Sequence, residues 1–174
     1  RFARAKRILS LDADFFHAEA GSLYYTREFS KGRRVASKSD DMNRLYVAES
    51  QLTLTGSMAD HRLRLASSQM IGLAAAIAIR ISPQTSALLE PYARDIGIDA
   101  KWIDACAKDL LAHRGESLVV AGAHLPVEVH VLAYSINWML ENIGKTVDFV
   151  DHAPAESASI GDLALAIKAG SVKT

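Results

Sequence analysis

Short apolar runs alternate with longer amphipathic stretches along this chain. Four runs rich in Leu, Ile and Val have the length and composition of buried strands. The first two end in an acidic residue, Asp12 and Glu49, so each is expected to carry a carboxylate into the loop that follows. The predicted strands are residues 8–12, 45–49, 118–122 and 146–150.

The stretches between these runs have the composition or periodicity of helices. One helix is predicted to begin at Ser67 or Ser68, either of which can act as N-cap, and to run through Ile79. Another opens at Pro126 and ends at Gly144, which serves as the C-cap. Further helices are predicted at residues 23–30, 86–94, 100–113 and 160–169.

Strands that alternate with helices form βαβ units, which pack most economically as a mainly parallel sheet with helices on both faces. The predicted fold class is therefore α/β, a Rossmann-like three-layer domain. No repeat and no Gly-, Pro- or Ser-rich tract marks a boundary, so residues 1–174 are predicted to form a single domain. The chain begins without Met, and residues 171–174 resemble the opening of another strand, so we expect a fragment of a longer chain.

Composition narrows the choice of partners. Of the 174 residues, 49% are apolar and 23% are charged, which is the balance of one soluble globular domain. Twenty Lys and Arg balance twenty Asp and Glu, so the overall charge does not predict a nucleic-acid surface. The longest uncharged apolar stretch, residues 70–79, has about half the length of a membrane span. The single cysteine, Cys106, cannot form an internal disulfide or supply a cluster, and is expected to fill the core.

Ligands of open α/β sheets bind beyond the carboxyl ends of the strands. Residues 12–21, the first such loop, lack the glycines that let a pyrophosphate approach the backbone, and their acidic side chains repel phosphate. Glu49 has the position of a ribose-binding acid, although a solvated strand-end carboxylate is the favoured interpretation. The basic residues within 31–41 are likewise interpreted as a solvated connection rather than a phosphate site.

No motif in the sequence predicts a catalytic residue or a metal ligand. His124, His130 and His152 could meet at one edge of the sheet, but none has the spacing of a metal site. A nucleophile elbow and a Walker-type phosphate loop are both missing from the sequence. Ser22, Ser57 and Ser67 are therefore interpreted as caps and turn formers.

Residues 45–73 (LYVAESQLTLTGSMADHRLRLASSQMIGL) resemble the molybdopterin oxidoreductase superfamily, also called the dimethyl sulfoxide reductase family. In that family a strand ends in Asp-Pro-Arg, threonines and an Ala-Asp pair follow, and Arg-Pro-Gly-Thr-Asp opens a helix. Here residues 49–51 (ESQ) stand at the first motif, Thr53, Thr55 and Asp60 match the second, and residues 66–70 (ASSQM) replace the third. The resemblance implies a shared scaffold whose ligand residues have changed.

In that family the third motif helps to hold the guanosine end of the cofactor, and here Met70 stands where its carboxylate would be. A methionine cannot accept a hydrogen bond from a guanine N–H. The resemblance therefore implies a vestigial pocket; the alternative is a working domain that binds the guanosine part of molybdopterin. In both cases the pocket residues are Glu49, Thr53, Thr55, Asp60, Ser67 and Ser68.

Four segments are more similar still to the large iron–sulfur subunit of alternative complex III, a quinol:electron-acceptor oxidoreductase that lacks molybdopterin. They are residues 9–15, 42–50, 53–63 and 142–147. This resemblance implies no cofactor in the fragment, iron–sulfur clusters downstream of Thr174, and a parent chain on the periplasmic or extracytoplasmic side. It also implies partners among the other domains of the parent and the subunits of a membrane electron-transfer complex, without nucleic acid and without direct membrane insertion.

Two further questions remain open: whether the domain is a protein-interaction module, and what role Asp60 has. A protein-interaction module is favoured if an apolar patch of several hundred Å² lies on one face. For Asp60, the favoured role is a carboxylate that accepts backbone N–H bonds within residues 53–60, and the competing role is a ligand contact. His61 and Arg62 are then exposed neighbours or subunit contacts. The cofactor-free scaffold predicts strand ends that are filled by the protein itself.

Overall fold

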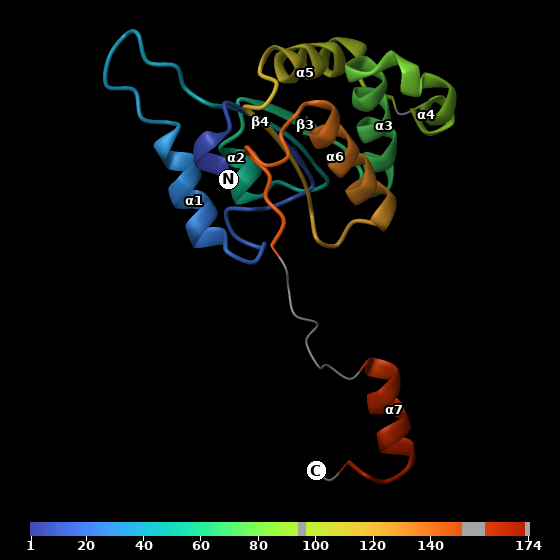
Figure 1. The fold of residues 1–174 in the computed structure, drawn as a ribbon. Coiled ribbons are helices and arrows are strands. Elements are labelled where there is room, and N and C mark those ends of the chain that lie inside the picture. The colour runs from blue at the N-terminus through green and yellow to red at the C-terminus, as the bar shows by residue number, and fades with distance from the viewer. Residues whose placement is uncertain (94–96, 151–158, 173–174) are drawn as a thin grey trace.

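Four parallel strands form the sheet at the centre of the fold, in the order β3-β2-β1-β4. The computed structural model describes residues 1–93, 97–150 and 159–172. Helices cover both faces of the sheet, so the α/β, Rossmann-like three-layer class is confirmed (Figure 1). The strands are β1 (Arg7–Leu11), β2 (Arg44–Glu49), β3 (His61–Arg64) and β4 (Ser117–Ala121).

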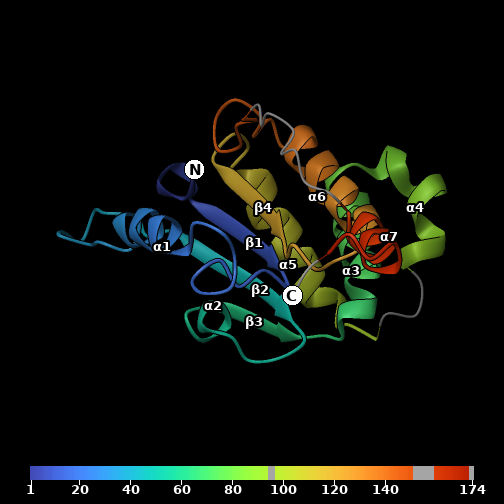
Figure 2. The ribbon, with the colours of Figure 1, turned by 90° about the horizontal axis from the view of Figure 1, so that it is seen from below.

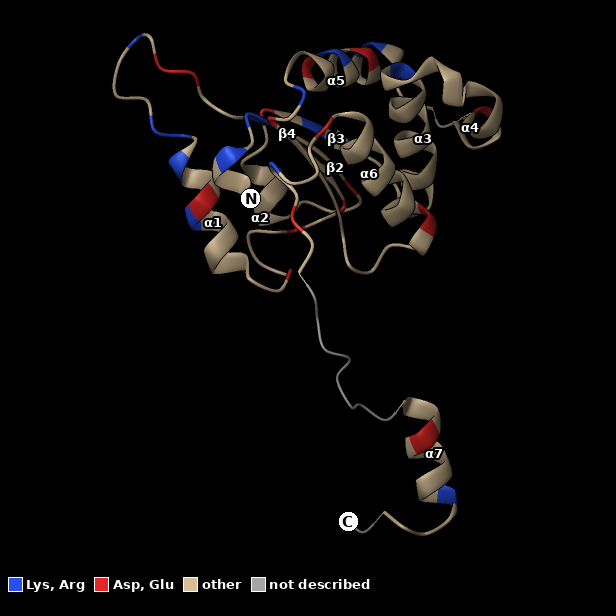
Figure 3. Ribbon diagram, in the orientation of Figure 1, with Lys and Arg blue, Asp and Glu red and all other residues tan. Residues whose placement is uncertain are grey.

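The helices are unequally divided between the two faces of the sheet. Figure 2 shows α1 on one side of the sheet and α3, α4 and α6 on the other. Charged residues stand out on α1 and α5, whereas α6 is almost entirely tan (Figure 3). The helices are α1 (Ser22–Lys31), α2 (Leu54–Ser57), α3 (Met70–Ile81), α4 (Ser86–Ala93), α5 (Ala100–Ala112), α6 (Val127–Met139) and α7 (Ile160–Lys168), with short 3-10 turns at Phe2–Arg4, Ser67–Gln69 and Pro83–Thr85.

Alternation along the strands explains the two cores. Every residue of β1 is buried, and successive side chains point to opposite faces. Leu9 and Leu11 join the core beneath α3, α5 and α6, while Ile8 joins the smaller core beneath α1, with Phe15 and Phe29. Cys106 lies fully buried in the larger core, as predicted, and burial raises the pKa of its thiol.

One predicted strand is wrong, and one strand of the sheet is missing from the prediction. Residues 146–150 do not form a strand: the Gly144 N–H donates to the Val147 carbonyl, and Thr146 hydrogen-bonds Ser117 through its hydroxyl. The fourth strand is instead β3, at the edge of the sheet beside β2. Three of its four residues are exposed, so it lacks the apolar run used to recognise the other strands.

Two helix ends also differ from the prediction. α6 ends at Met139, before Gly144, because Glu141 adopts a left-handed conformation (φ 59°) and a turn follows. Neither Ser67 nor Ser68 caps α3: both lie in the 3-10 turn that precedes it, where no side-chain cap forms. In the part of the chain that the structure describes, no helix combines the length and apolarity needed to cross a membrane.

Candidate functional site

The strand order places a topological switch point between β1 and β4. The chain passes from β1 to β2 in one direction across the sheet, and from β3 to β4 in the other. In open α/β sheets, ligands bind in the crevice that such a reversal leaves at the carboxyl ends of the strands. The candidate site is therefore the region that follows Leu11, Glu49 and Ala121.

Asp12 lies at the centre of this region. It follows β1 directly, is 7% exposed, and has a positive φ of 50°, which is uncommon for a residue other than glycine. Its carboxylate accepts hydrogen bonds from the Ser50 N–H (3.0 Å) and the Ser67 hydroxyl (2.5 Å), and lies 3.4 Å from His124 Nε2. Burial alone raises the pKa of Asp12, but these hydrogen bonds outweigh burial and lower it. Asp12 thus joins the ends of three chain segments as an ionised acceptor.

The backbones that follow β1 and β4 lie close together at the switch point. A Cβ on Gly122 would lie 2.2 Å from the carbonyl oxygen of Asp12, so only glycine fits where β4 ends. The Gly122 N–H also donates to the Leu11 carbonyl at 2.9 Å. The backbones of Asp12 and Gly122 are therefore in contact just past the ends of β1 and β4.

Two further carboxylates of the loop after β1, those of Asp14 and Glu19, accept hydrogen bonds from neighbouring loops. Asp14 Oδ1 accepts the N–H (3.1 Å) and the hydroxyl (2.7 Å) of Thr55. The Thr55 hydroxyl in turn accepts the Phe16 N–H at 3.1 Å. Glu19 Oε1 accepts the Ala123 N–H at 3.1 Å, just beyond β4. The acidic loop is thus bonded to the segments that follow β2 and β4.

Glu49 is buried, so the prediction of a solvated carboxylate is wrong. Only 1% of the residue is exposed. Its carboxylate accepts the Thr53 hydroxyl at 2.6 Å and pairs with Arg62 of β3. A Cβ on Gly56 would lie 1.8 Å from Glu49 Oε1, so a glycine is needed where α2 crosses this carboxylate. The Thr53 hydroxyl also accepts the Gly56 N–H at 3.0 Å, which makes Thr53 the N-cap of α2.

These contacts share one pattern: backbone N–H groups at the carboxyl end of the sheet are bound by carboxylates of the same chain. Such N–H groups are the donors that a phosphate uses when it binds beyond a strand. A phosphate arriving here would have to displace the carboxylates and lie beside their negative charges. The donors are those of Ser50, Thr53, Thr55 and Ala123, and their acceptors are Asp12, Glu49, Asp14 and Glu19 respectively.

The six predicted pocket residues do not form one pocket. Glu49, Thr53, Thr55 and Ser67 do lie at the carboxyl end of the sheet, where the three hydroxyls donate to carboxylates. Ser68 is exposed. A hollow of about 460 Å³ remains on the surface, lined by Asp14, His17, Gln51, Leu52, Thr53, Leu54 and Ser57.

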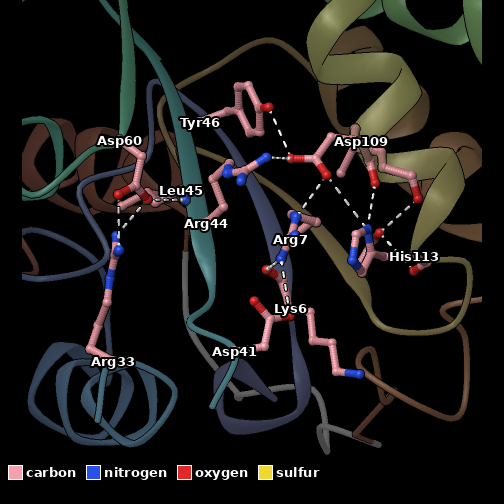
Figure 4. A network of polar contacts seen from close by, with 12 residues as sticks. Lys6, Arg7, Arg33, Asp41, Arg44, Leu45, Tyr46, Asp60, Asp109 and His113 are labelled. Carbon is pink, nitrogen blue, oxygen red and sulfur yellow. Dashed lines mark hydrogen bonds and ion pairs between the residues drawn. The ribbon is translucent and has the colours of Figure 1, made fainter. Parts of the chain in front are cut away.

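Asp60 lies at the other end of β2. Its carboxylate accepts the Leu45 N–H at 2.7 Å and both terminal nitrogens of Arg33, at 2.9 and 2.7 Å (Figure 4). Leu45 is four residues from Glu49 along β2, which corresponds to about 13 Å. Asp60 does accept a backbone N–H, as predicted, but the donor is Leu45 and not a residue within 53–60. Arg33 belongs to the segment interpreted as solvated and is its exception, because it pairs with Asp60, whereas Lys31, Arg34 and Lys38 are exposed as predicted.

A second polar cluster, at the amino end of the sheet, is absent from the sequence prediction. Arg7 and Arg44 begin β1 and β2 and are paired in register, and Tyr46 lies two residues further along β2. Asp109 of α5 accepts hydrogen bonds from all three, at 2.8, 2.7 and 3.0 Å (Figure 4). Burial raises the pKa of Asp109, but the bonds from Arg7, Tyr46 and Arg44 outweigh it and lower the pKa. Burial and this carboxylate raise the pKa of Tyr46 to about 12.

This second cluster holds α5 against the sheet. Its members are remote in sequence: Arg7 and Asp109 are 102 positions apart, and Arg7 and Arg44 meet through the pairing of β1 with β2. An Asp on an amphipathic helix and an Arg at a strand start are each unremarkable alone. The sequence does place an Arg at the start of each of two neighbouring strands. That pattern indicates an acidic partner only once the register of β1 against β2 is known.

Neither the histidines nor the acids form a candidate metal centre. Within the described ranges, no three His, Cys, Asp or Glu side chains converge on a point that could hold an ion. Of the three histidines considered from sequence, His124 lies beside Asp12 and His152 lies outside the described residues. Comparison of the chain with protein-family models and with curated proteins finds no match.

Proposed function

We propose that this chain is a cofactor-free scaffold domain, similar to a molybdopterin oxidoreductase domain, in an iron–sulfur subunit of a membrane-associated, quinol-oxidising electron-transfer complex. One observation carries the cofactor-free part: four carboxylates of the chain occupy the backbone N–H donors at the carboxyl end of the sheet. The remainder of the proposal rests on the sequence resemblance. In this role the domain positions other parts of the complex and performs no redox step itself.

Two further features favour a pocket that has been filled. Met70, at the position where the family's third motif carries a carboxylate, is fully buried in the larger core. Glu49 takes the place of the first residue of the Asp-Pro-Arg motif, and its carboxylate is occupied by Thr53 and Arg62. Both of these positions therefore serve the interior of this fold.

The proposal extends to the parent chain through the resemblance alone. The electron carriers are iron–sulfur clusters located downstream of Thr174, and the partners are other domains of the parent and subunits of the complex. The parent lies on the periplasmic or extracytoplasmic side and associates with the membrane through those partners. Elemental analysis of the purified complex tests this: iron without stoichiometric molybdenum is expected, and stoichiometric molybdenum would contradict it.

The alternative is a domain that binds the guanosine part of a molybdopterin cofactor. Titration with guanosine diphosphate separates the two, with the fluorescence of Trp102 and Trp138 and the melting temperature as readouts. A ligand of the native state must raise the melting temperature. The scaffold predicts no shift at millimolar nucleotide. Saturable micromolar binding that is lost in Thr53→Val but kept in Asp104→Asn, a change on the distant helix α5, would establish the alternative.

A further inference from the structure

Helix α6 carries an apolar stripe that stays exposed in the part of the chain that the structure describes. Its inner face, with Val129, Ala133 and Ile136, is buried in the larger core. The opposite side is also apolar, and Trp138 on it is 66% exposed. A helix that is apolar on all sides is typical of a buried position. We define the α6 stripe as Val127, Val131, Tyr134 and Trp138, all exposed and spaced at i, i+4, i+7 and i+11.

Helix α7 also carries an exposed apolar face. It stands apart from the body of the domain and none of its residues is buried (Figure 1). Its start is fixed by a complete capping box between Ser159 and Asp162. A helix of nine residues is marginal in water without packing, so α7 needs a surface to pack on. We define the α7 stripe as Ile160, Leu163, Ala164 and Ile167, which share one helix face at i, i+3, i+4 and i+7.

The chain leaves the body of the domain at the α6 stripe itself. The ring of Phe149 lies 5.7 Å from the ring of Tyr134, centroid to centroid. Eight residues, 151–158, then separate Val150 from Ser159, and a chain of that length reaches up to about 30 Å. The α6 stripe is about 16 Å long, with Tyr134 between its ends. Both ends are therefore within reach, and so short a connection gives an effective concentration of about a millimolar.

From these observations we propose that α7 docks on the α6 stripe of its own chain. The charges favour an antiparallel arrangement, which places Lys168 at the end of α7 near Glu128. Glu128 is the only acidic residue of α6, which contains no Lys or Arg. A parallel arrangement would bring Asp162 to Glu128 instead. In the antiparallel register Ile167 faces Val131, Leu163 faces Tyr134, and Ile160 faces Trp138. This inference does not depend on the proposed redox complex.

Quenching of Trp138 fluorescence by acrylamide tests the docking, in a Trp102→Phe background that leaves Trp138 as the sole reporter. The expected result is a protected Trp138 whose emission shifts to the red and becomes readily quenched in the double variant Leu163→Asp, Ile167→Asp. Leu165→Asp is the control, because it places a negative charge on the opposite side of α7. Equal quenching in all three proteins would overturn the proposal.

Disulfide trapping identifies the occupant. The pair Val131→Cys and Ile167→Cys is expected to close within one chain under mild oxidation, since a disulfide needs Cα atoms within about 7 Å. The pair Val131→Cys and Leu165→Cys is expected to remain open. Native Cys106 is fully buried and does not compete. A cross-linked dimer whose yield rises with concentration would mean that a second copy supplies α7, and would overturn docking within the chain; an open first pair would overturn it as well.

Discussion

The two ends of the sheet are held together by different chemistry. At the amino end, Asp109 pairs with two arginines, Arg7 and Arg44, that begin adjacent strands. At the carboxyl end, Asp12 and Asp14 accept backbone N–H groups and hydroxyls. The first arrangement is an ion network that needs its charges to balance. The second fills donors that would otherwise be open to an anionic ligand. The same residue type therefore anchors a helix at one end and joins neighbouring loops at the other.

The largest expected effect is at the amino end. Asp109→Ala leaves Arg7, whose side chain is 8% exposed, with only the exposed Asp41 at 4.0 Å as an acidic partner. Loss of one member of a buried ion pair costs about 3–5 kcal/mol. The free energy of unfolding from urea titration measures this. Asp104→Ala is the control, because Asp104 lies on the same helix in an exposed pair with Arg80 and is expected to cost no more than about 1 kcal/mol. Similar losses in both variants would show that the amino-end network is not cooperative.

The next effect is at the carboxyl end, where packing rather than charge limits substitution. Gly56→Ala would place a methyl group 1.8 Å from Glu49 Oε1, and the shift needed to relieve this overlap is expected to cost about 1–3 kcal/mol. Chemical unfolding again provides the measurement. Gly161→Ala, in the exposed helix α7, is expected to be neutral or slightly stabilising. A Gly56→Ala protein of normal stability would mean that Glu49 is free to move.

Acid weakens both ends, because the pKa values of Asp12 and Asp109 are lowered in the folded protein. A group with a lowered folded pKa contributes stability above its unfolded pKa, near 3.8, and loses it as the pH falls through the folded pKa. The free energy of unfolding is therefore expected to fall below about pH 4. Asp12→Asn should reduce that slope by up to about 1.4 kcal/mol per pH unit. An unchanged slope would show that Asp12 titrates alike in both states.

The sequence predicted the strands whose residues are mostly buried, because their apolar composition sets them apart from loops. Residues 8–12, 45–49 and 118–122 are mainly apolar runs, fully buried in β1 and largely buried in β2 and β4, and each contains most of a strand of the sheet. β3 was missed because its side chains are exposed at the sheet edge, as expected for an edge strand but also for a loop. Residues 146–150 have a strand-like composition, yet after the turn at Gly144 Val147 forms only an isolated bridge with Ile143 and the segment does not pair with a strand of the sheet.

The candidate site could be predicted only as a region. That polar residues would meet beyond Asp12 and Glu49 follows from parallel strands alone. Which of them would be buried does not, because the burial of Glu49 depends on Arg62 of the unpredicted strand β3 and on the absence of a side chain at Gly56. Asp60 was assigned to the wrong end of β2 for the same reason, since its position is set by the pairing of β3 with β2.

The smallest expected effect separates two adjacent serines that the sequence treats as equivalent. Ser67 donates to Asp12 at 2.5 Å across 55 residues, whereas Ser68 is exposed. Ser67→Ala removes one hydrogen bond from an ionised acceptor that keeps others, so a loss of about 1 kcal/mol in the free energy of unfolding is expected. Ser68→Ala should stay within about 0.5 kcal/mol of the parent protein. If both serines acted as helix caps the two losses would be alike, so their difference measures how far the carboxyl end depends on bonds to Asp12.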